Sequence, residues 1–426
     1  MTRLDGQRRL FAGTPDKIFE AVSNQWIDRS KAGGYTSTAD GRWRFAQFGN
    51  VTLATNQSDK IQASTSGEFD DISEAPAAKI IITTSGFVMA FGTSDSTYGD
   101  SPDGWWCSGL YDHTTWTPSQ ATQAANGRFL DTPGDVRAAK TLGSIVVAYK
   151  ERSMYIGQYV GPPVIWSWSQ VPGEVGALSN DCVIDIGTAH AFIGVDDFWV
   201  YDGSRPERIG APIREWFFEE MDPEYSYRVQ GYYDRQKDLL AWYFPSRGSG
   251  GKLNRCVLYN TKTKQWGKAT REIQATVEYV TSAITYDELG DKYETYDSFD
   301  DITYDSPRWL ANSAAPAIVD ASNVVGLLLG EPLPCSLTTW DLGDDATYSA
   351  LTRVRARFLS NPVTGKLQAY YKDDPADTPI MGKSATLDRA RFDLLWSARW
   401  HRLRMDFTGP VEISALQFDL AADGTI

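Results

Sequence analysis

Short apolar runs, separated by turn residues, dominate the first 270 positions of the chain. Between Val183 and Trp266 each of the runs HAFIG, FWVY, LLAWYF and RCVLY adjoins a turn, at Asp196-Asp197, Asp202-Gly203, DRQKD or NTKTK. Runs of β-branched and aromatic residues joined by such turns are typical of consecutive antiparallel strands. Because apolar side chains fall on both faces of each small sheet, the sheet is stable only when neighbouring sheets cover it. The pattern therefore predicts a radial or stacked array of small sheets.

The same pattern recurs along the chain in units of roughly 35 to 45 residues with about four strands each, as a propeller blade requires. Four units precede the two in the stretch above, at 8–30, 43–71, 78–116 and 135–172. In the third unit we expect a loop at 94–104 and a last strand at TTWTP (114–118). Helical periodicity is confined to Ala211–Met221. We predict an all-β chain with a β-propeller of about six blades.

The pattern changes twice beyond the repeats, so we expect three regions. Residues 1–283 form the propeller, 284–334 form an acidic connecting region that closes it, and 335–426 form a separate domain. In the last region GKLQAYYKD and VEISALQFDL alternate strongly between apolar and polar residues, as in an antiparallel β-sandwich. A length of 426 residues suits one large β-domain plus a smaller one.

The connecting region carries Thr-Tyr-Asp three times, at 285–287, 295–297 and 303–305. Two interpretations stay open: stacked turns in which each Asp caps a turn, or a solvated acidic loop. In either case its carboxylates are candidates for an acidic patch on a surface or in a channel. They are Asp287, Glu288, Asp291, Asp297, Asp300, Asp301 and Asp305.

Basic residues gather in the last region, although the whole chain has a net charge of −14. Arg353, Arg355 and Arg357 alternate along one predicted strand and so emerge on one of its faces, as Arg402 and Arg404 do on another. These five arginines are our candidates for a subunit interface on a basic face of the domain. The overall acidity argues against a protein that grips nucleic acid along its whole surface.

Candidate chemistry is sparse. His113, His190 and His401 are scattered among strand and turn residues, which favours structural histidines over a metal site. Four separated cysteines with no CxxC favour buried free thiols, as in a protein that folds in the cytosol. Asp196-Asp197 lies at a hairpin turn, where the backbone-capping role outweighs a catalytic one.

Further signs of an enzyme or a membrane protein are also lacking in the sequence. The chain contains no GxSxG, HExxH, P-loop or GxGxxG motif and no apolar run long enough for a membrane span. Tryptophans such as Trp166, Trp168 and Trp242 could stack on sugars, but their spacing along strands favours the core. We therefore predict no catalytic residue, no metal, no cofactor and no enzymatic activity.

An ordered series of phrases covers nearly the whole chain and resembles the tail hub, or nozzle, family of short-tailed bacteriophages, which includes the packaged-DNA stabilisation proteins. The phrases include LFAGTPDKIFEA (10–21), RWRFAQFGNVTLATN (42–56), EAPAAKIIITTSGFVMAF (74–91), WWCSGLYDHTTWTP (105–118), YKERSMYIGQYVGPPVIWSW (149–168), FIGVDDFWVYDGSRPERIG (192–210) and VLYNTKTKQW (257–266). In that family an acidic Thr-Tyr-Asp region and a terminal domain ending near RWHRLRMDF follow.

The resemblance implies a structural virion protein, assembled in the host cytoplasm and located in the phage tail. Such a protein forms a homo-hexameric tube below the portal and adaptor proteins, retains and releases the genome, and carries fibres or a needle-like plug. DNA would pass through it transiently and without sequence specificity. Because the chain starts almost at the first repeat, we expect it to lack the N-terminal docking extension of longer relatives.

Two other classes of protein compete with this interpretation. A propeller that binds or cleaves bacterial surface glycan would be a soluble monomer with clustered carboxylates in a pocket. A cellular propeller scaffold would carry a signature repeat, and the WD40 and kelch signatures are missing from this sequence.

Overall fold

The computed structural model describes residues 1–22, 25–38, 41–280, 314–328 and 332–425, and its chain divides into two compact units. The first unit spans Met1–Leu328 and the second spans Leu329–Ile426. Together they contain many antiparallel sheets, so the predicted all-β class is confirmed. No helix in the described ranges is long and apolar enough to cross a membrane.

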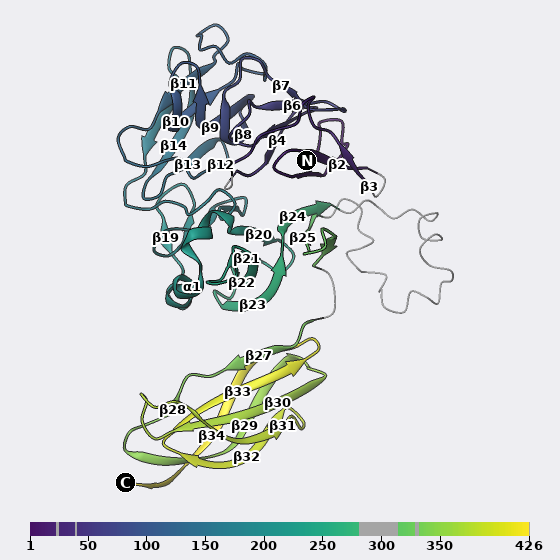
Figure 1. The fold of residues 1–426 in the computed structure, drawn as a ribbon. Helices are drawn as coiled ribbons and strands as arrows, with labels where there is room; N and C mark the ends of the chain where they lie inside the picture. Colours follow the sequence, from purple (N-terminus) through teal and green to yellow (C-terminus); the bar gives the residue numbers. More distant parts are fainter. Residues whose placement is uncertain (23–24, 39–40, 281–313, 329–331, 426) are drawn as a thin grey trace, which may run out of the picture. The chain divides into compact units, whose positions relative to one another are not determined.

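In the described part of the first unit, seven small sheets follow one another, and within each sheet the strands pair in chain order (Figure 1). The first three sheets contain β1 (Phe11–Gly13), β2 (Ile18–Val22) and β3 (Gln25–Asp28); β4 (Arg44–Phe48), β5 (Val51–Thr55), β6 (Gln62–Ser64) and β7 (Asp70–Asp71); and β8 (Ala77–Thr84), β9 (Phe87–Asp95), β10 (Gly99–Cys107) and β11 (Ala125–Arg128). The next two contain β12 (Ala138–Leu142), β13 (Ile145–Tyr149), β14 (Met154–Gly161) and β15 (Ile165–Gln170); and β16 (Ile184–Asp185), β17 (His190–Ile193), β18 (Phe198–Tyr201) and β19 (Glu207–Arg208). The last two contain β20 (Gln230–Asp234), β21 (Leu239–Pro245), β22 (Leu253–Asn260) and β23 (Trp266–Ile273); and β24 (Ala275–Val280), β25 (Ala314–Val319) and β26 (Val325–Leu327).

The sheets pack face to face, and β13 shows why the sequence requires it. Val146 and Ala148 enter a core shared with the sheet before, while Val147 and Tyr149 enter a core shared with the sheet after. Successive strand residues point to opposite faces, so an uninterrupted apolar run needs cover on both sides. The expectation that each small sheet depends on its neighbours is met here.

In two groups of three successive sheets, the first strands lie beside one another. β8 contacts both β4 and β12, and β20 contacts both β16 and β24. Residues of the first sheet and of the last sheet line one common cavity, with Phe11 on β1 and Val319 on β25 among them. The beginning and the end of the first unit thus lie together at one half-open cavity.

The predicted helix at Ala211–Met221 is present as the shorter α1 (Arg214–Glu220), followed by the 3-10 helix η1 (Pro223–Arg228). Phe217 is fully buried, with its ring 4.9 Å from Phe198 and 4.7 Å from Phe244. Burying an aromatic side chain of this size stabilises a fold by about 1.5–3 kcal/mol. The helix therefore packs against the two adjoining sheets.

The third sheet differs from the prediction in two places. The expected loop at 94–104 supplies the ends of β9 and β10, which form a long hairpin with an irregularity between Ser101 and Trp105. The expected strand at 114–118 is a turn, and Ala125–Arg128 is the fourth strand instead. Trp116 is fully buried and donates a hydrogen bond from Nε1 to the His113 carbonyl at 2.9 Å, so the apolar character that suggested a strand serves to anchor the turn.

The second unit contains two antiparallel sheets whose inner faces share one core, as predicted for a sandwich. One sheet contains β27 (Cys335–Thr338), β28 (Leu342–Gly343), β30 (Thr364–Lys372), β31 (Ile380–Thr386) and β33 (Trp400–Thr408). The other contains β29 (Thr347–Ser360), β32 (Arg391–Ala398) and β34 (Glu412–Thr425). Val354 from one sheet and Leu403 from the other are fully buried in the shared core.

Candidate functional site

The candidate interface arginines on β29 lie on its outer face, opposite the buried Val354 and Ala356. Arg353 donates from Nε to Asp393 at 2.5 Å, and Arg355 lies 3.5 Å from the Asp419 carboxylate. Arg357 is exposed and forms no ion pair with any residue that the structure describes. Of the three, Arg357 is the cation that remains available to another chain.

Arg402 and Arg404 lie on β33, which belongs to the other sheet of the sandwich. Arg402 makes two hydrogen bonds to the Asp341 carboxylate, at 2.7 and 2.8 Å, and Arg404 makes one to Asp406 at 3.0 Å. The inner faces of both sheets are occupied by the core, so the two arginine groups emerge on opposite outer faces. The expectation of one basic face is therefore wrong, because alternation fixes the face of a strand but not the sheet that contains it.

The seven candidate carboxylates between Asp287 and Asp305 lie outside the described residues. Their role in an acidic patch or channel stays a prediction. The flanking strands β24 and β25 pair from Ala275–Val319 to Val280–Ala314, so this segment connects two neighbouring strands of one sheet.

The residues weighed for catalysis or sugar binding have structural roles. Asp196 and Asp197 accept hydrogen bonds from Arg208 Nη2 (2.9 Å) and from the Phe198 amide (2.8 Å), respectively. Trp166 is 3% exposed and Trp242 is fully buried, which confirms the core interpretation for both. The described residues contain no cluster of His, Cys, Asp and Glu suited to a metal ion.

Buried histidines and cysteines follow the sequence prediction with one exception. His190 is fully buried, with Nδ1 2.7 Å from the Tyr149 hydroxyl and Nε2 2.9 Å from the Thr141 carbonyl, and burial lowers its pKa. Cys107, Cys182 and Cys256 are buried free thiols. The expectation of burial is wrong for Cys335, which is exposed because its strand β27 lies at an edge of the sandwich.

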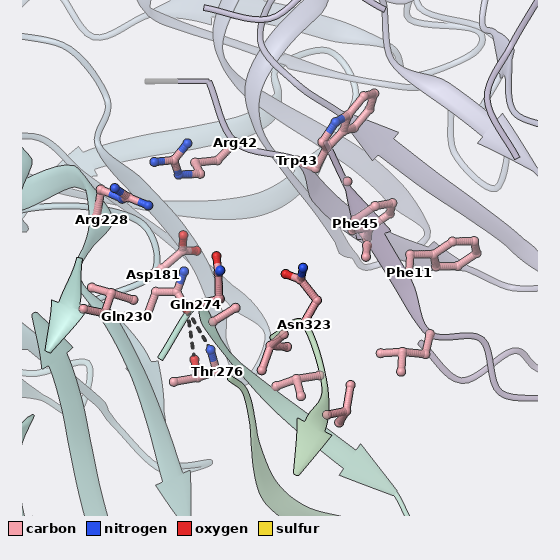
Figure 2. A pocket seen from close by; sticks show the side chains of 18 of the residues that line it. Phe11, Arg42, Trp43, Phe45, Asp181, Arg228, Gln230, Gln274, Thr276 and Asn323 are labelled. Atoms are coloured by element: carbon pink, nitrogen blue, oxygen red, sulfur yellow. Dashed lines mark hydrogen bonds between the residues drawn. The ribbon is translucent and has the colours of Figure 1, made fainter. Parts of the chain in front are cut away.

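A half-open cavity of about 840 Å³ lies in the first unit. Its walls come from β1 to β4, β12, β20 and β24 to β26. Figure 2 shows Phe11, Trp43 and Phe45 together on one side of it. The Phe11 and Phe45 rings stack at 5.2 Å, and Trp43 is fixed by a 2.7 Å hydrogen bond from Nε1 to the Thr14 carbonyl. This side is a preformed aromatic wall.

The opposite side of the cavity is charged and carries more cations than acids (Figure 2). The lining contains Arg42, Lys140 and Arg228 but one carboxylate, Asp181. Asp181 is already paired with Arg44 of β4. Within the described residues none of the three lining cations has a carboxylate in ion-pair contact.

Electrostatics agree with this geometry. Burial, followed by the nearby positive charge of Arg228, lowers the pKa of Arg42. Burial also lowers the pKa of Lys140, against the opposing effect of Asp181. Burial alone would raise the pKa of Asp181, but Arg44 and Lys140 outweigh it and hold that pKa below its usual value. The cavity thus holds like charges that oppose one another.

Sequence analysis did not identify this charged cavity. Arg42 precedes β4, Lys140 lies on β12 and Arg228 ends η1, so each is an isolated cation within a different repeat. No spacing rule connects residues that are brought together by the ends of separate sheets. The one local signal that could have indicated these residues is a cation just before the first strand of a repeat, as at Arg42 and Arg228.

No protein-family model matches the chain, and a search of curated proteins finds no match to it either.

Proposed function

We propose that the chain is a structural tail protein, the hub or nozzle of a short-tailed bacteriophage. Six copies would form a tube below the portal and adaptor proteins through which the genome is retained and then released. The chain would also carry tail fibres or a plug. In this role it would act without turnover and would be located in the virion.

The observation that carries the proposal is the order of the small sheets. Strand meanders of three or four strands follow one another in the first unit, each packed against the next, and a separate two-sheet unit follows. The ordered phrases of the sequence resemble a family with that same succession of a propeller and a terminal β-domain. The agreement between the order of the sheets in the structure and the order of the phrases in the sequence supports the assignment.

We infer further that the sheets of the first unit are blades around a common axis. The contacts among β4, β8 and β12, and among β16, β20 and β24, support inner strands that neighbour one another. The shared cavity between the first and last sheets supports closure. Seven sheets would then make seven blades, one more than the sequence suggests, because the strands at 275–327 add a blade across the acidic segment.

Charge suits the passage of DNA in this proposal. A net charge of −14 repels phosphates, whereas each phosphate held by Lys or Arg would release counterions and add to the affinity. A closed ring also needs two different complementary faces on each subunit. Arg357, which is exposed and has no ion-pair partner in the described part of the chain, is suited to one of them.

Mass photometry of the purified full chain, over a range of concentrations, tests the proposal. The expected result is a species of six times the 47.4 kDa chain mass, favoured by concentration. A monomer at every concentration that binds or cleaves bacterial polysaccharide would instead support the glycan-directed alternative.

A further inference from the structure

Among the described residues, the cationic side of the cavity holds no carboxylate paired with its lining cations. Arg42 and Arg228 both line the cavity and repel each other. An arginine stays protonated in proteins, so the pair cannot relieve its repulsion by losing a proton. Partly buried charges normally have a partner, because desolvation without pairing is costly.

Within the described part of the unit, no carboxylate is in ion-pair contact with Arg42 or Arg228. Arg42 Nη1 donates to its neighbouring Gly41 carbonyl at 2.9 Å, and its guanidinium lies 5.2 Å from the Tyr227 ring centroid. Asp181 is held by Arg44, which makes it a poor counter-ion for a further cation. Lys140 is a third cation in the lining of the same cavity, where Asp181 acts on both Lys140 and Arg42.

We propose that this cavity binds an anionic ligand through a phosphate group held by Arg42, Arg228 and Lys140. Two guanidinium groups present paired N–H donors that match phosphate oxygens, and an ammonium group adds a point charge. This site is separate from the proposed role of the chain in a tail tube and does not depend on it.

The remainder of the cavity defines what else the ligand can carry. A volume of about 840 Å³ exceeds the needs of a bare phosphate and falls within the range of roughly 300–1,000 Å³ typical of small-molecule sites. Opposite the cations lie the rings of Phe11, Trp43 and Phe45. Free phosphate and the phosphate of a nucleotide share the recognised group, and a nucleotide base would meet the aromatic wall.

Isothermal titration calorimetry of the full chain, with inorganic phosphate, pyrophosphate and a nucleoside triphosphate, tests the site. Chloride at matched ionic strength serves as the reference for non-specific binding. The expected result is saturable binding at one site per chain, weakened at least tenfold by Arg228→Gln and by Arg42→Gln. Arg205→Gln is the matched control, because Arg205 has a side chain 83% exposed and lies outside the cavity lining, and it should bind as the unmodified chain does.

The two sources of phosphate are separated in the same experiment. Tighter binding of the nucleoside triphosphate than of pyrophosphate, with a change in tryptophan fluorescence, assigns the site to nucleotides. Equal affinity assigns it to free phosphate. Both results support the proposal.

Thermal unfolding without ligand is a second test of the proposal, which applies even if one variant is unsuitable for calorimetry. Removing one of two like charges relieves their repulsion, so in phosphate-free buffer Arg228→Gln should unfold at a higher temperature than the unmodified chain. Added phosphate should raise the unfolding temperature of the unmodified chain by more than that of Arg228→Gln. The proposal is overturned if no probe binds saturably, or if binding is the same in Arg228→Gln and Arg42→Gln as in Arg205→Gln.

Discussion

Arg44 on β4 and Asp181, just before β16, form an ion pair although they are 137 positions apart in the sequence. Their side chains are 12% and 29% exposed. The pair connects the second sheet of the first unit to the fifth across the interior. This contact holds the second and the fifth sheets together, although two other sheets lie between them in the sequence.

Replacing Asp181 by Asn should therefore destabilise the first unit. The change leaves Arg44 without its partner and adds to the uncompensated charge beside Lys140. We expect a loss of about 1–3 kcal/mol in the free energy of unfolding, below the cost for a fully buried pair because water still reaches Asp181. Urea denaturation would measure it, with Glu207→Gln as a control at an exposed ion pair. Equal losses in both variants would contradict the structural role of the pair.

Stability should fall as the pH drops from 7.5 to 5.5. Burial lowers the pKa of His190 and of His401 below the usual value of 6.5, so the unfolded chain takes up protons first. The stability that depends on the neutral rings is fully present above pH 6.5 and is lost as the pH falls toward the folded-state pKa. Each ring contributes at most about 1.4 kcal/mol over this interval.

Urea denaturation at the two pH values measures this loss. His190→Gln should reduce the pH dependence of the first unit and leave that of the second unchanged. An unfolding free energy that is the same at pH 7.5 and 5.5 would refute the assignment of these rings as buried and neutral.

Trp242 should be among the most sensitive positions of the first unit. Its Nε1 donates to the Cys182 carbonyl at 2.9 Å, and its ring lies 5.4 Å from that of Phe198, so it joins the fifth sheet to the sixth. Trp242→Phe leaves a buried carbonyl unpaired and a gap in the core, at an expected cost of about 2–4 kcal/mol. Thermal unfolding would show a lower transition for the first unit. Trp340→Phe, at a side chain 76% exposed, should change stability by less than about 0.5 kcal/mol.

Reversing the charge of Arg357 should weaken the proposed ring. Arg357 is exposed on the outer face of β29 and has no intrachain ion pair among the described residues, so Arg357→Glu should leave folding unchanged while it disturbs a contact between subunits. Mass photometry should show a smaller fraction of hexamer than for Arg205→Glu, a control at another exposed arginine. A hexamer fraction equal to that of the control would remove Arg357 from the interface.

The strands of the first unit could largely be predicted because most apolar runs form one strand each, and each strand pairs with the next one in the sequence. The run IVVAY forms β13, and its side chains pack alternately into two cores. The exceptions have local causes. Trp116 resembles a strand residue but anchors a turn, and the polar start of β10 resembles a loop but pairs with β9.

Long-range relationships could not be predicted in the same way. The pairing of β24 with β25 joins segments on either side of the acidic region, and nothing in either segment specifies the other. Likewise the alternation of Arg353 and Arg355 fixed their common face, but the sheet that contains them depends on which strands pair. The charged cavity depends on the ends of several sheets at once, beyond the reach of any local pattern.

Negative-stain microscopy of the purified chain, mixed with the portal assembly of the proposed phage tail, tests the central claim most directly. The account predicts ring-shaped particles with sixfold symmetry that attach coaxially to the portal. Single unattached particles without rotational symmetry, at concentrations where the portal itself is intact, would contradict it.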